Sequence, residues 1–153
     1  MKAKKLGWLQ GVRLCPSPNF DQRPKQDEVS LLVIHCISLP EGRYGGSEIE
    51  DFFQNKLDCQ QDPSFKCIEG LEVSAHFLIK RCGEIVQFVS VFDRAWHAGK
   101  SQFKGREKCN DFSIGIELEG TDKDIFEKSQ YSSLVKLTEE IREVCPKITK
   151  DRI

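Results

Sequence analysis

The chain has 153 residues, 39% of them apolar and 31% charged, with a net charge of −1, which suits one soluble domain with one hydrophobic core. Basic and acidic residues are mixed along the sequence, so no basic stripe predicts binding to nucleic acid. Neither a membrane-spanning stretch nor a signal peptide is recognisable, so we expect a protein that stays in the cytoplasm without contact to a membrane. We also expect it to be a monomer.

The first predicted element is a strand over residues 30–37, a short run of apolar and β-branched side chains. Such a run is typical of a central strand that is buried on both faces. A loop rich in proline and glycine ends it. Ser47 and Glu50 then have the spacing of a capping box, which predicts a short helix through Phe53.

Further along the chain, strands come first and a helix follows. Two strand-like runs, residues 73–79 and 84–89, flank Gly83 and predict a β-hairpin. Residues 113–120 alternate between apolar and polar or small side chains, as in another strand. From about 128 to 145 the period becomes helical, with an apolar stripe made of Tyr131, Leu134, Leu137, Ile141 and Val144. Strands and helices are interspersed, so the fold class is α/β or α+β with a mixed central sheet flanked by helices.

The cysteines argue against a disulfide-stabilised or zinc-ribbon fold. There are seven of them, an odd number, and none forms a Cys-x-x-Cys pair. This pattern predicts reduced thiols in a reducing compartment.

His35 is the first candidate for a functional residue. It lies near the end of the predicted strand 30–37, just before a glycine-rich loop. Strand ends that face loops are where sites of α/β folds are built, and a neutral imidazole is a natural zinc ligand. The alternative is a histidine that only packs in the core or at the surface, which is the commoner situation for a single histidine.

Glu117 is the second candidate, a carboxylate in the middle of the strand 113–120. Ile114, Ile116 and Leu118 point to one face of this strand and Glu117 to the other. Partial burial would raise its pKa and suit it to general acid–base catalysis. The alternative is an exposed glutamate on the solvent face of an edge strand.

The third candidate is the segment 93–99, in which Trp96 and His97 enter a glycine loop. The tryptophan face could stack on a sugar ring and the pair could line a sugar or peptide pocket. A tryptophan in the core with a histidine at its rim is an equally good interpretation.

Taken together, several segments resemble the N-acetylmuramoyl-L-alanine amidases, and among them the cytosolic members that act on 1,6-anhydro-muramyl substrates. The segments are residues 30–35, 37–40, 73–79, 94–99 and 110–120, and the likeness runs in order from about Gly7 to the last residue. This family also contains the bacteriophage-lysozyme-type amidases and the peptidoglycan recognition proteins. The resemblance implies their mixed sheet flanked by helices, in a single amidase domain over residues 1–153.

The resemblance also implies a reaction, the zinc-dependent hydrolysis of the amide between (anhydro-)N-acetylmuramic acid and L-alanine of a muropeptide, in cell-wall recycling. By position, His35 is implied as a zinc ligand and Glu117 as the glutamate that moves the proton of the attacking water. Trp96, His97 and Arg106 lie in segments that border the substrate cleft in the family, where an arginine could pair with a substrate carboxylate. His76 matches a family histidine that is not a ligand, which implies a structural role.

The sequence departs from the family pattern at the end of the chain and beside His35. The family takes its remaining zinc ligands from segments that would follow Ile153, so we expect an amidase domain that is incomplete at its C-terminus. Cys36 stands where the family usually has asparagine. Two alternatives to an active amidase follow, a catalytically inactive truncated homologue and a zinc-free module that binds muropeptides.

Overall fold

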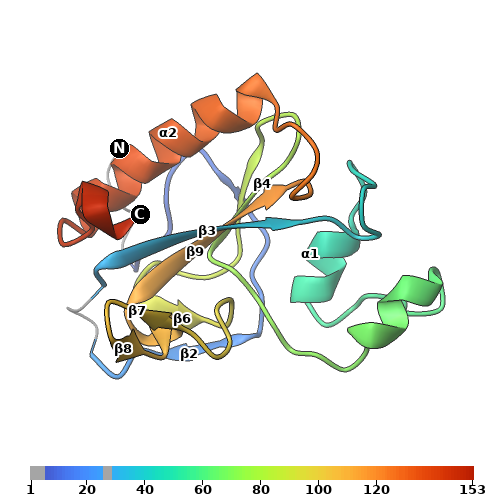
Figure 1. The fold of residues 1–153 in the computed structure, drawn as a ribbon, viewed down its shortest axis with the longest axis horizontal. Helices are drawn as coiled ribbons and strands as arrows, with labels where there is room; N and C mark the ends of the chain where they lie inside the picture. Colours follow the sequence, from blue (N-terminus) through green and yellow to red (C-terminus); the bar gives the residue numbers. More distant parts are fainter. Residues whose placement is uncertain (1–5, 26–28) are drawn as a thin grey trace.

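The computed structural model describes residues 6–25 and 29–153, and its centre is a five-stranded mixed sheet with the strand order β1-β5-β4-β9-β3 (Figure 1). The neighbours β1–β5, β4–β9 and β9–β3 are parallel, whereas β4–β5 is antiparallel. The strands are β1 (Arg13–Leu14), β3 (Leu31–Ile37), β4 (Phe77–Ile79), β5 (Ile85–Gln87) and β9 (Ser113–Glu119). The predicted fold class, a mixed sheet flanked by helices, is therefore confirmed.

Helices cover both faces of this sheet (Figure 1). The long helix α2 (Lys128–Val144) crosses one face, and the short helix α1 (Glu48–Phe53) lies on the other. Two small ribbons, β2 (Phe20–Gln22) with β6 (Asp93–Ala95) and β7 (Gln102–Phe103) with β8 (Arg106–Glu107), flank the α1 side. The described residues also form three short 3-10 turns: η2 (Pro63–Cys67), η3 (Cys109–Asp111) and η4 (Lys150–Arg152).

The interior strand β9 lies between two parts of the core. Its residues Ile114, Ile116 and Leu118 pack in one cluster with residues of α2. Successive side chains of a strand point to opposite faces, so the residues between them face the other side of the sheet. The other face of the sheet packs against α1 through Phe52 and Phe53. Glu117 points to that second face, as the alternation in the sequence predicted.

The predicted hairpin and the long helix are confirmed with different bounds. Phe77–Ile79 pairs antiparallel with Ile85–Gln87, so the strands are shorter than the runs that predicted them. In α2, Leu137 and Ile141 are fully buried. Tyr131 does not belong to the buried stripe, since it is half exposed and its ring contacts Phe126 instead.

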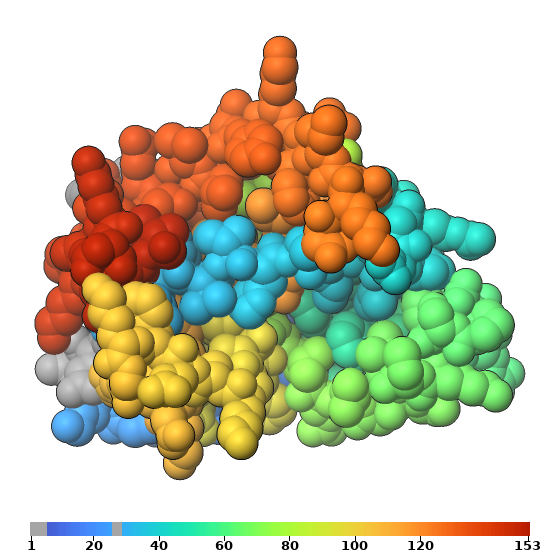
Figure 2. All heavy atoms as spheres, in the orientation of Figure 1, coloured from blue at the N-terminus to red at the C-terminus, as the bar shows by residue number. Residues whose placement is uncertain are grey.

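Two local predictions were wrong. The strand 30–37 is not central: β3 lies at the end of the sheet formed by the described residues, and its outer edge reaches the surface between α2 and the β7–β8 hairpin (Figure 2). An apolar run does not distinguish the two positions, because β3 packs on α2 with one face and lines a groove with the other. The capping box at Ser47 is also absent, because the Ser47 hydroxyl donates to Asp51 rather than to the backbone.

All seven cysteines lie in the described part of the chain and carry free thiols, as predicted. Within residues 6–25 and 29–153, no helix combines the length and the apolar character needed to cross a membrane.

Candidate active site

The carboxyl group of Glu117 has a strongly raised pKa. Glu117 is only 9% exposed on the interior strand β9, and burial raises its pKa to about 8. Its Oε2 atom is buried and has no hydrogen-bond partner among the described residues. A buried carboxyl oxygen without a hydrogen-bond partner is uncommon unless the group serves a reaction or a ligand.

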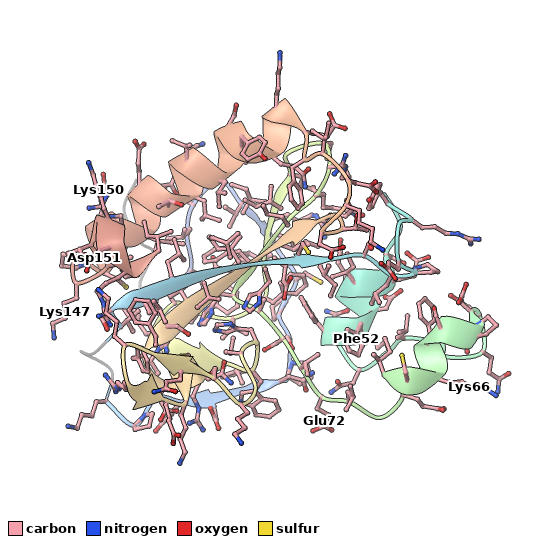
Figure 3. The ribbon with its side chains drawn as sticks, in the orientation of Figure 1. Phe52, Lys66, Glu72, Lys147, Lys150 and Asp151 are labelled. Atoms are coloured by element: carbon pink, nitrogen blue, oxygen red, sulfur yellow. The ribbon has the colours of Figure 1, made fainter. Side chains whose placement is uncertain are left out.

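A cleft of about 370 Å³ opens beside this carboxyl group, and we call it the Glu117 cleft. The wall on the α1 side includes Phe52 and, from the segment that precedes β4, Glu72 (Figure 3). The complete lining is Ile37, Phe52, Phe53, Glu72, Val73, Ser74, Trp96, His97, Gly99, Asn110 and Glu117. The cleft thus combines apolar and aromatic side chains with a few polar groups, as small-molecule sites do.

The side chains of Ser74 and Asn110 hold the backbone of Trp96 and His97 at the cleft. The backbone N–H of Trp96 donates to the Ser74 hydroxyl at 3.0 Å. The side-chain oxygen of Asn110 accepts from the backbone N–H groups of His97 and Ala98, at 3.1 and 3.0 Å. The loop 96–99 is therefore held at several points, so its aromatic side chains have a defined position.

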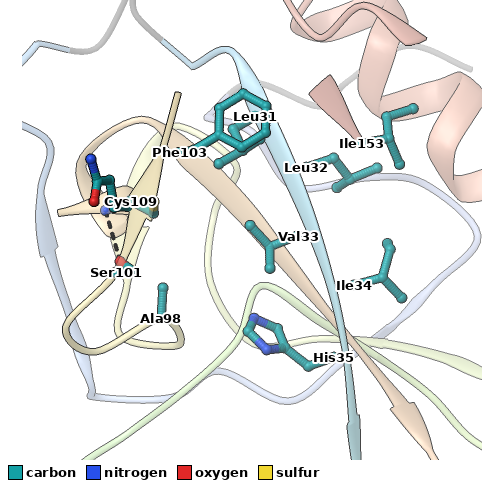
Figure 4. Close-up of a pocket in the computed structure, with 11 residues that line it drawn as sticks. Leu31, Leu32, Val33, Ile34, His35, Ala98, Ser101, Phe103, Cys109 and Ile153 are labelled. Carbon is teal, nitrogen blue, oxygen red and sulfur yellow. Dashed lines mark hydrogen bonds between the residues drawn. The ribbon is translucent and has the colours of Figure 1, made fainter. Parts of the chain in front are cut away.

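His35 shares the face of the sheet with Glu117. The two residues are direct partners in the parallel β3–β9 register. Burial lowers the pKa of His35, so its imidazole is neutral at pH 7. Its ring lies at one end of an apolar groove of about 590 Å³ along the open edge of β3, which we call the β3-edge groove (Figure 4).

His97 connects the two hollows, because it lines the Glu117 cleft and also contacts His35. Its Nδ1 lies 2.9 Å from Nε2 of His35, and its Nε2 lies 3.1 Å from the hydroxyl oxygen of Ser113. Burial lowers the pKa of His97 to about 3, and the neighbouring His35 adds to this shift. The residues that the sequence singled out therefore meet: His35, Trp96, His97 and Glu117 lie around one region of the sheet.

His76 is a structural residue. It is fully buried, and its Nδ1 accepts the backbone N–H of Gly115 at 3.1 Å. A neutral imidazole then carries its proton on Nε2, which donates to the backbone carbonyl of Asp93 at 3.0 Å. The buried guanidinium of Arg23 lies against the same ring and donates to the backbone carbonyl of Ser113 at 2.8 Å.

Arg106 lies elsewhere. It belongs to the exposed strand β8, and its guanidinium lies 4.1 Å from the centre of the Phe112 ring. It is not among the residues that line the Glu117 cleft. The structure thus brings four of the five predicted site residues together and leaves Arg106 apart.

The described residues do not assemble a complete metal site. No group of three or more histidine, cysteine, aspartate or glutamate side chains within residues 6–25 and 29–153 could hold a metal ion. A catalytic zinc ion normally takes three protein ligands, and His35 can supply one of them.

Sequence reasoning missed the residues that hold the candidate side chains. Ser113 and Asn110 are polar residues at the start of a strand and in a turn, positions where serine and asparagine are common for local reasons. Only the folded arrangement shows that both contact His97.

These features describe a mixed-sheet domain with a buried carboxyl group beside a cleft that aromatic side chains help to line. The profile of the N-acetylmuramoyl-L-alanine amidase family matches residues 25–153, and the chain therefore belongs to this family of enzymes.

Three known proteins show which members of this family the chain resembles. The chain is 56% identical over 147 residues to the 1,6-anhydro-N-acetylmuramyl-L-alanine amidase AmpD of Haemophilus influenzae, covering 96% of this chain and 80% of that protein. It is similar to a crystal structure of a selenomethionine derivative of AmpD, with a TM-score of 0.92 and 50% identity over 94% of this chain and 80% of that one. The Escherichia coli amidase AmiD, solved with anhydro-N-acetylmuramic acid-L-Ala-D-γ-Glu-L-Lys, gives a TM-score of 0.56 and 28% identity over 82% of this chain and 47% of that one.

Proposed function

We propose that this chain hydrolyses the amide bond between 1,6-anhydro-N-acetylmuramic acid and L-alanine in muropeptides, as a cytoplasmic step of cell-wall recycling. The observation that carries the proposal is the buried carboxyl group of Glu117, which lines the Glu117 cleft and whose Oε2 has no hydrogen-bond partner among the described residues. The close likeness to AmpD supports the substrate class. A muropeptide is also the ligand named for the more distant AmiD structure.

Glu117 is proposed as the general acid–base group. A carboxyl group with a pKa of about 8 exchanges its proton near neutral pH. It can therefore accept a proton from the attacking water and pass it to the amine of L-alanine as the bond to the muramyl carbonyl breaks. The apolar walls around it restrict water and keep the group poised for both transfers.

Trp96 and His97 are proposed to hold the sugar side of the substrate. The Trp96 side chain lines the cleft together with Glu117, and its ring offers an apolar face to a pyranose. Arg106 is proposed, with its position on β8, to contact the carboxylates of a longer muropeptide that extends beyond the cleft.

Zinc dependence is proposed from the family, with His35 as one ligand. The described residues do not form a set of three, so no step of the reaction is derived through the metal. Zinc, when bound, would polarise the scissile carbonyl and lower the pKa of its water.

The test is hydrolysis of anhydro-N-acetylmuramyl-L-Ala-D-γ-Glu-diaminopimelate by the purified chain, followed by mass spectrometry of the released anhydro-sugar. Bound zinc is measured in the same sample. We expect turnover, and we expect Glu117→Gln to lower it by about 10²–10⁴-fold, the range for loss of a general acid–base group. Muropeptide binding by calorimetry without turnover, and without a response to added zinc, would instead favour the zinc-free binding module.

A further inference from the structure

Asn19 does not line the Glu117 cleft, but it forms hydrogen bonds with residues that do. It directly precedes β2 and is only 2% exposed. Its backbone N–H donates to the Ser17 hydroxyl at 3.0 Å, and its backbone carbonyl accepts the Ser74 hydroxyl at 2.6 Å. Its side-chain amide is used as well. A buried asparagine that is satisfied in this way fixes the position of its neighbours.

The side chain of Asn19 holds the end of helix α1. The last carbonyl groups of a helix have no partner within it, and the carbonyl of Phe53 accepts instead from the Ser17 hydroxyl, with Nδ2 of Asn19 at 3.3 Å. Asn55, just beyond the helix, forms a reciprocal amide pair with Asn19. Nδ2 of Asn19 donates to Oδ1 of Asn55 at 2.8 Å, and Nδ2 of Asn55 donates to Oδ1 of Asn19 at 2.9 Å.

The same residue holds the segment before β4 and, through it, the loop 96–99. Nδ2 of Asn19 also donates to the backbone carbonyl of Val73 at 2.8 Å. The Ser74 hydroxyl, which donates to the carbonyl of Asn19, accepts the backbone N–H of Trp96 at 3.0 Å. The backbone N–H of Ser74 donates to the carbonyl of Trp96, also at 3.0 Å. Trp96 is thus connected to Asn19 through one serine.

These hydrogen bonds join two walls of the Glu117 cleft. We call Phe52 and Phe53 the α1 wall, and Trp96 and His97 the Trp96 wall; all four residues line the cleft. Three hydrogen-bonding partners of Asn19 belong to the same lining: Phe53, Val73 and Ser74. Both walls are therefore attached to one buried residue that is itself outside the cleft.

We propose that Asn19 is a positioning residue that sets the spacing between the α1 wall and the Trp96 wall. Aromatic side chains on two walls contact one ligand together only when the walls are correctly spaced. A cleft that is fixed before the ligand arrives also binds it better, because less has to be ordered on binding. The identity of the ligand, a muropeptide, rests on the proposed function, whereas the spacing of the walls does not.

Gln130 provides a matched control, because it is a buried amide that serves the other face of the sheet. It is fully buried on α2, and its Nε2 donates to the backbone carbonyls of Glu119 at 2.9 Å and Ile79 at 3.2 Å. Its Oε1 accepts the backbone N–H of Glu127 at 3.0 Å. None of these partners lines the Glu117 cleft. Gln130→Ala therefore removes a comparable set of hydrogen bonds without touching the walls.

The first test is ¹⁹F nuclear magnetic resonance of the ligand-free protein labelled with 5-fluorotryptophan. The chain has two tryptophans, and Trp8→Phe assigns their resonances. Asn19→Ala removes all side-chain bonds, whereas Asn55→Gly removes only the amide pair and keeps the positive φ of 60° at that position. We expect both variants to shift or broaden the Trp96 resonance and Gln130→Ala to leave it unchanged, with Trp8 as the internal reference.

Amide hydrogen exchange of the same ligand-free proteins reports on the α1 wall. The backbone N–H groups of residues 54–56 donate to carbonyl groups of α1. In Asn19→Ala we expect these amides to exchange about tenfold faster relative to the amides of β9, since a lost hydrogen bond changes the local opening equilibrium by about this factor. In Gln130→Ala the two sets should change in proportion, as for a purely structural loss.

The second test is the hydrolysis of anhydro-N-acetylmuramyl-L-Ala-D-γ-Glu-diaminopimelate. None of the described hydrogen bonds of Asn19 includes Glu117, whose place is set by the pairing of β9 with β3 and β4. We therefore expect Asn19→Ala to raise KM by about tenfold and to change kcat by less than about twofold. Gln130→Ala should change neither. A lower kcat at unchanged KM, or the same rise of KM in Gln130→Ala, would contradict the positioning role.

The two tests separate this inference from the proposed function. Unchanged Trp96 resonances and unchanged exchange of residues 54–56 in both Asn19→Ala and Asn55→Gly would overturn the spacing role, whatever the activity. If Asn19→Ala does not fold, Asn55→Gly gives the same comparison with a smaller loss. A parent chain that neither binds nor hydrolyses the muropeptide would refute the proposed function, and the ligand-free measurements would still decide the role of Asn19.

Discussion

At the scale of the residue, Glu117 shows what a single sequence can and cannot reveal. Alternation along residues 113–120 predicted which way Glu117 points, and the register and the two core clusters confirm it. The extent of its burial was not predictable, because an edge strand and a central strand can share this pattern. Its burial depends on β3, β4 and α1, which are supplied by residues far away in the sequence.

The pKa of Glu117 predicts a pH dependence of stability. Burial raises this pKa from about 4.5 to about 8 in the folded protein, so the folded state binds the proton more tightly than the unfolded chain does. The resulting stabilisation is complete below pH 4.5 and is lost as the pH rises through 8. One pKa unit corresponds to about 1.4 kcal/mol, so the loss amounts to a few kcal/mol.

Urea unfolding of the protein and of Glu117→Gln between pH 5 and 9 isolates this contribution. The buried histidines change stability in the opposite sense, but they do so equally in both proteins. We expect the variant to gain stability relative to the unmodified protein as the pH rises. Parallel pH profiles would show that the carboxyl group is not buried in solution.

Gly115 permits a second prediction at the residue scale. Gly115→Ala would place a methyl group 2.5 Å from Cγ of the His97 ring, whose position is fixed from several sides. We expect a loss of about 1–3 kcal/mol in the free energy of unfolding, measured by chemical denaturation, as for overpacking of a core. Gly46→Ala is the control, because its added methyl group meets only the tip of the flexible Glu48 side chain. Equal stability of both variants would contradict the packing described for His97.

At the scale of the element, local signals predicted which segments form helices and strands, but not their neighbours. The hairpin and α2 were predictable because their periodicities are local. The edge position of β3 was not, since strand order is decided by long-range pairing. The capping box failed for a related reason: a nearby carboxylate, Asp51, competes with the backbone for the Ser47 hydroxyl.

Glu119 joins elements that the sequence does not connect. It is buried at the end of β9, and its two carboxylate oxygens accept the backbone N–H groups of Gly45 and Arg81, at 2.7 and 2.9 Å. Glu119→Ala leaves both donors without this partner, which costs about 1–3 kcal/mol for each donor that stays buried. We expect a clear decrease in the thermal midpoint, whereas Glu139→Ala on the exposed side of α2 should change little. A midpoint equal to that of the control would rule out the connecting role.

At the scale of the whole molecule, the strands of the sheet should differ in their resistance to local unfolding. β9 is hydrogen-bonded on both sides, to β3 and β4, whereas β3 is paired on one side among the described strands. Amide hydrogen exchange of β9 should therefore require global unfolding, and the alternate amides of β3 that point away from β9 should exchange much faster. Uniform protection along β3 would mean that its outer edge is covered in solution.

The pairing of β3 with β9 also has a consequence for the order of events during folding. His35 and Glu117 become neighbours only when two parallel strands separated by about half of the chain come together, and such distant contacts form slowly because a large loop must close first. Helix α2 needs only contacts within its own 17 residues. During refolding the helical signal should therefore return before His35 and His97 reach their native environment, so the region around Glu117 is assembled last.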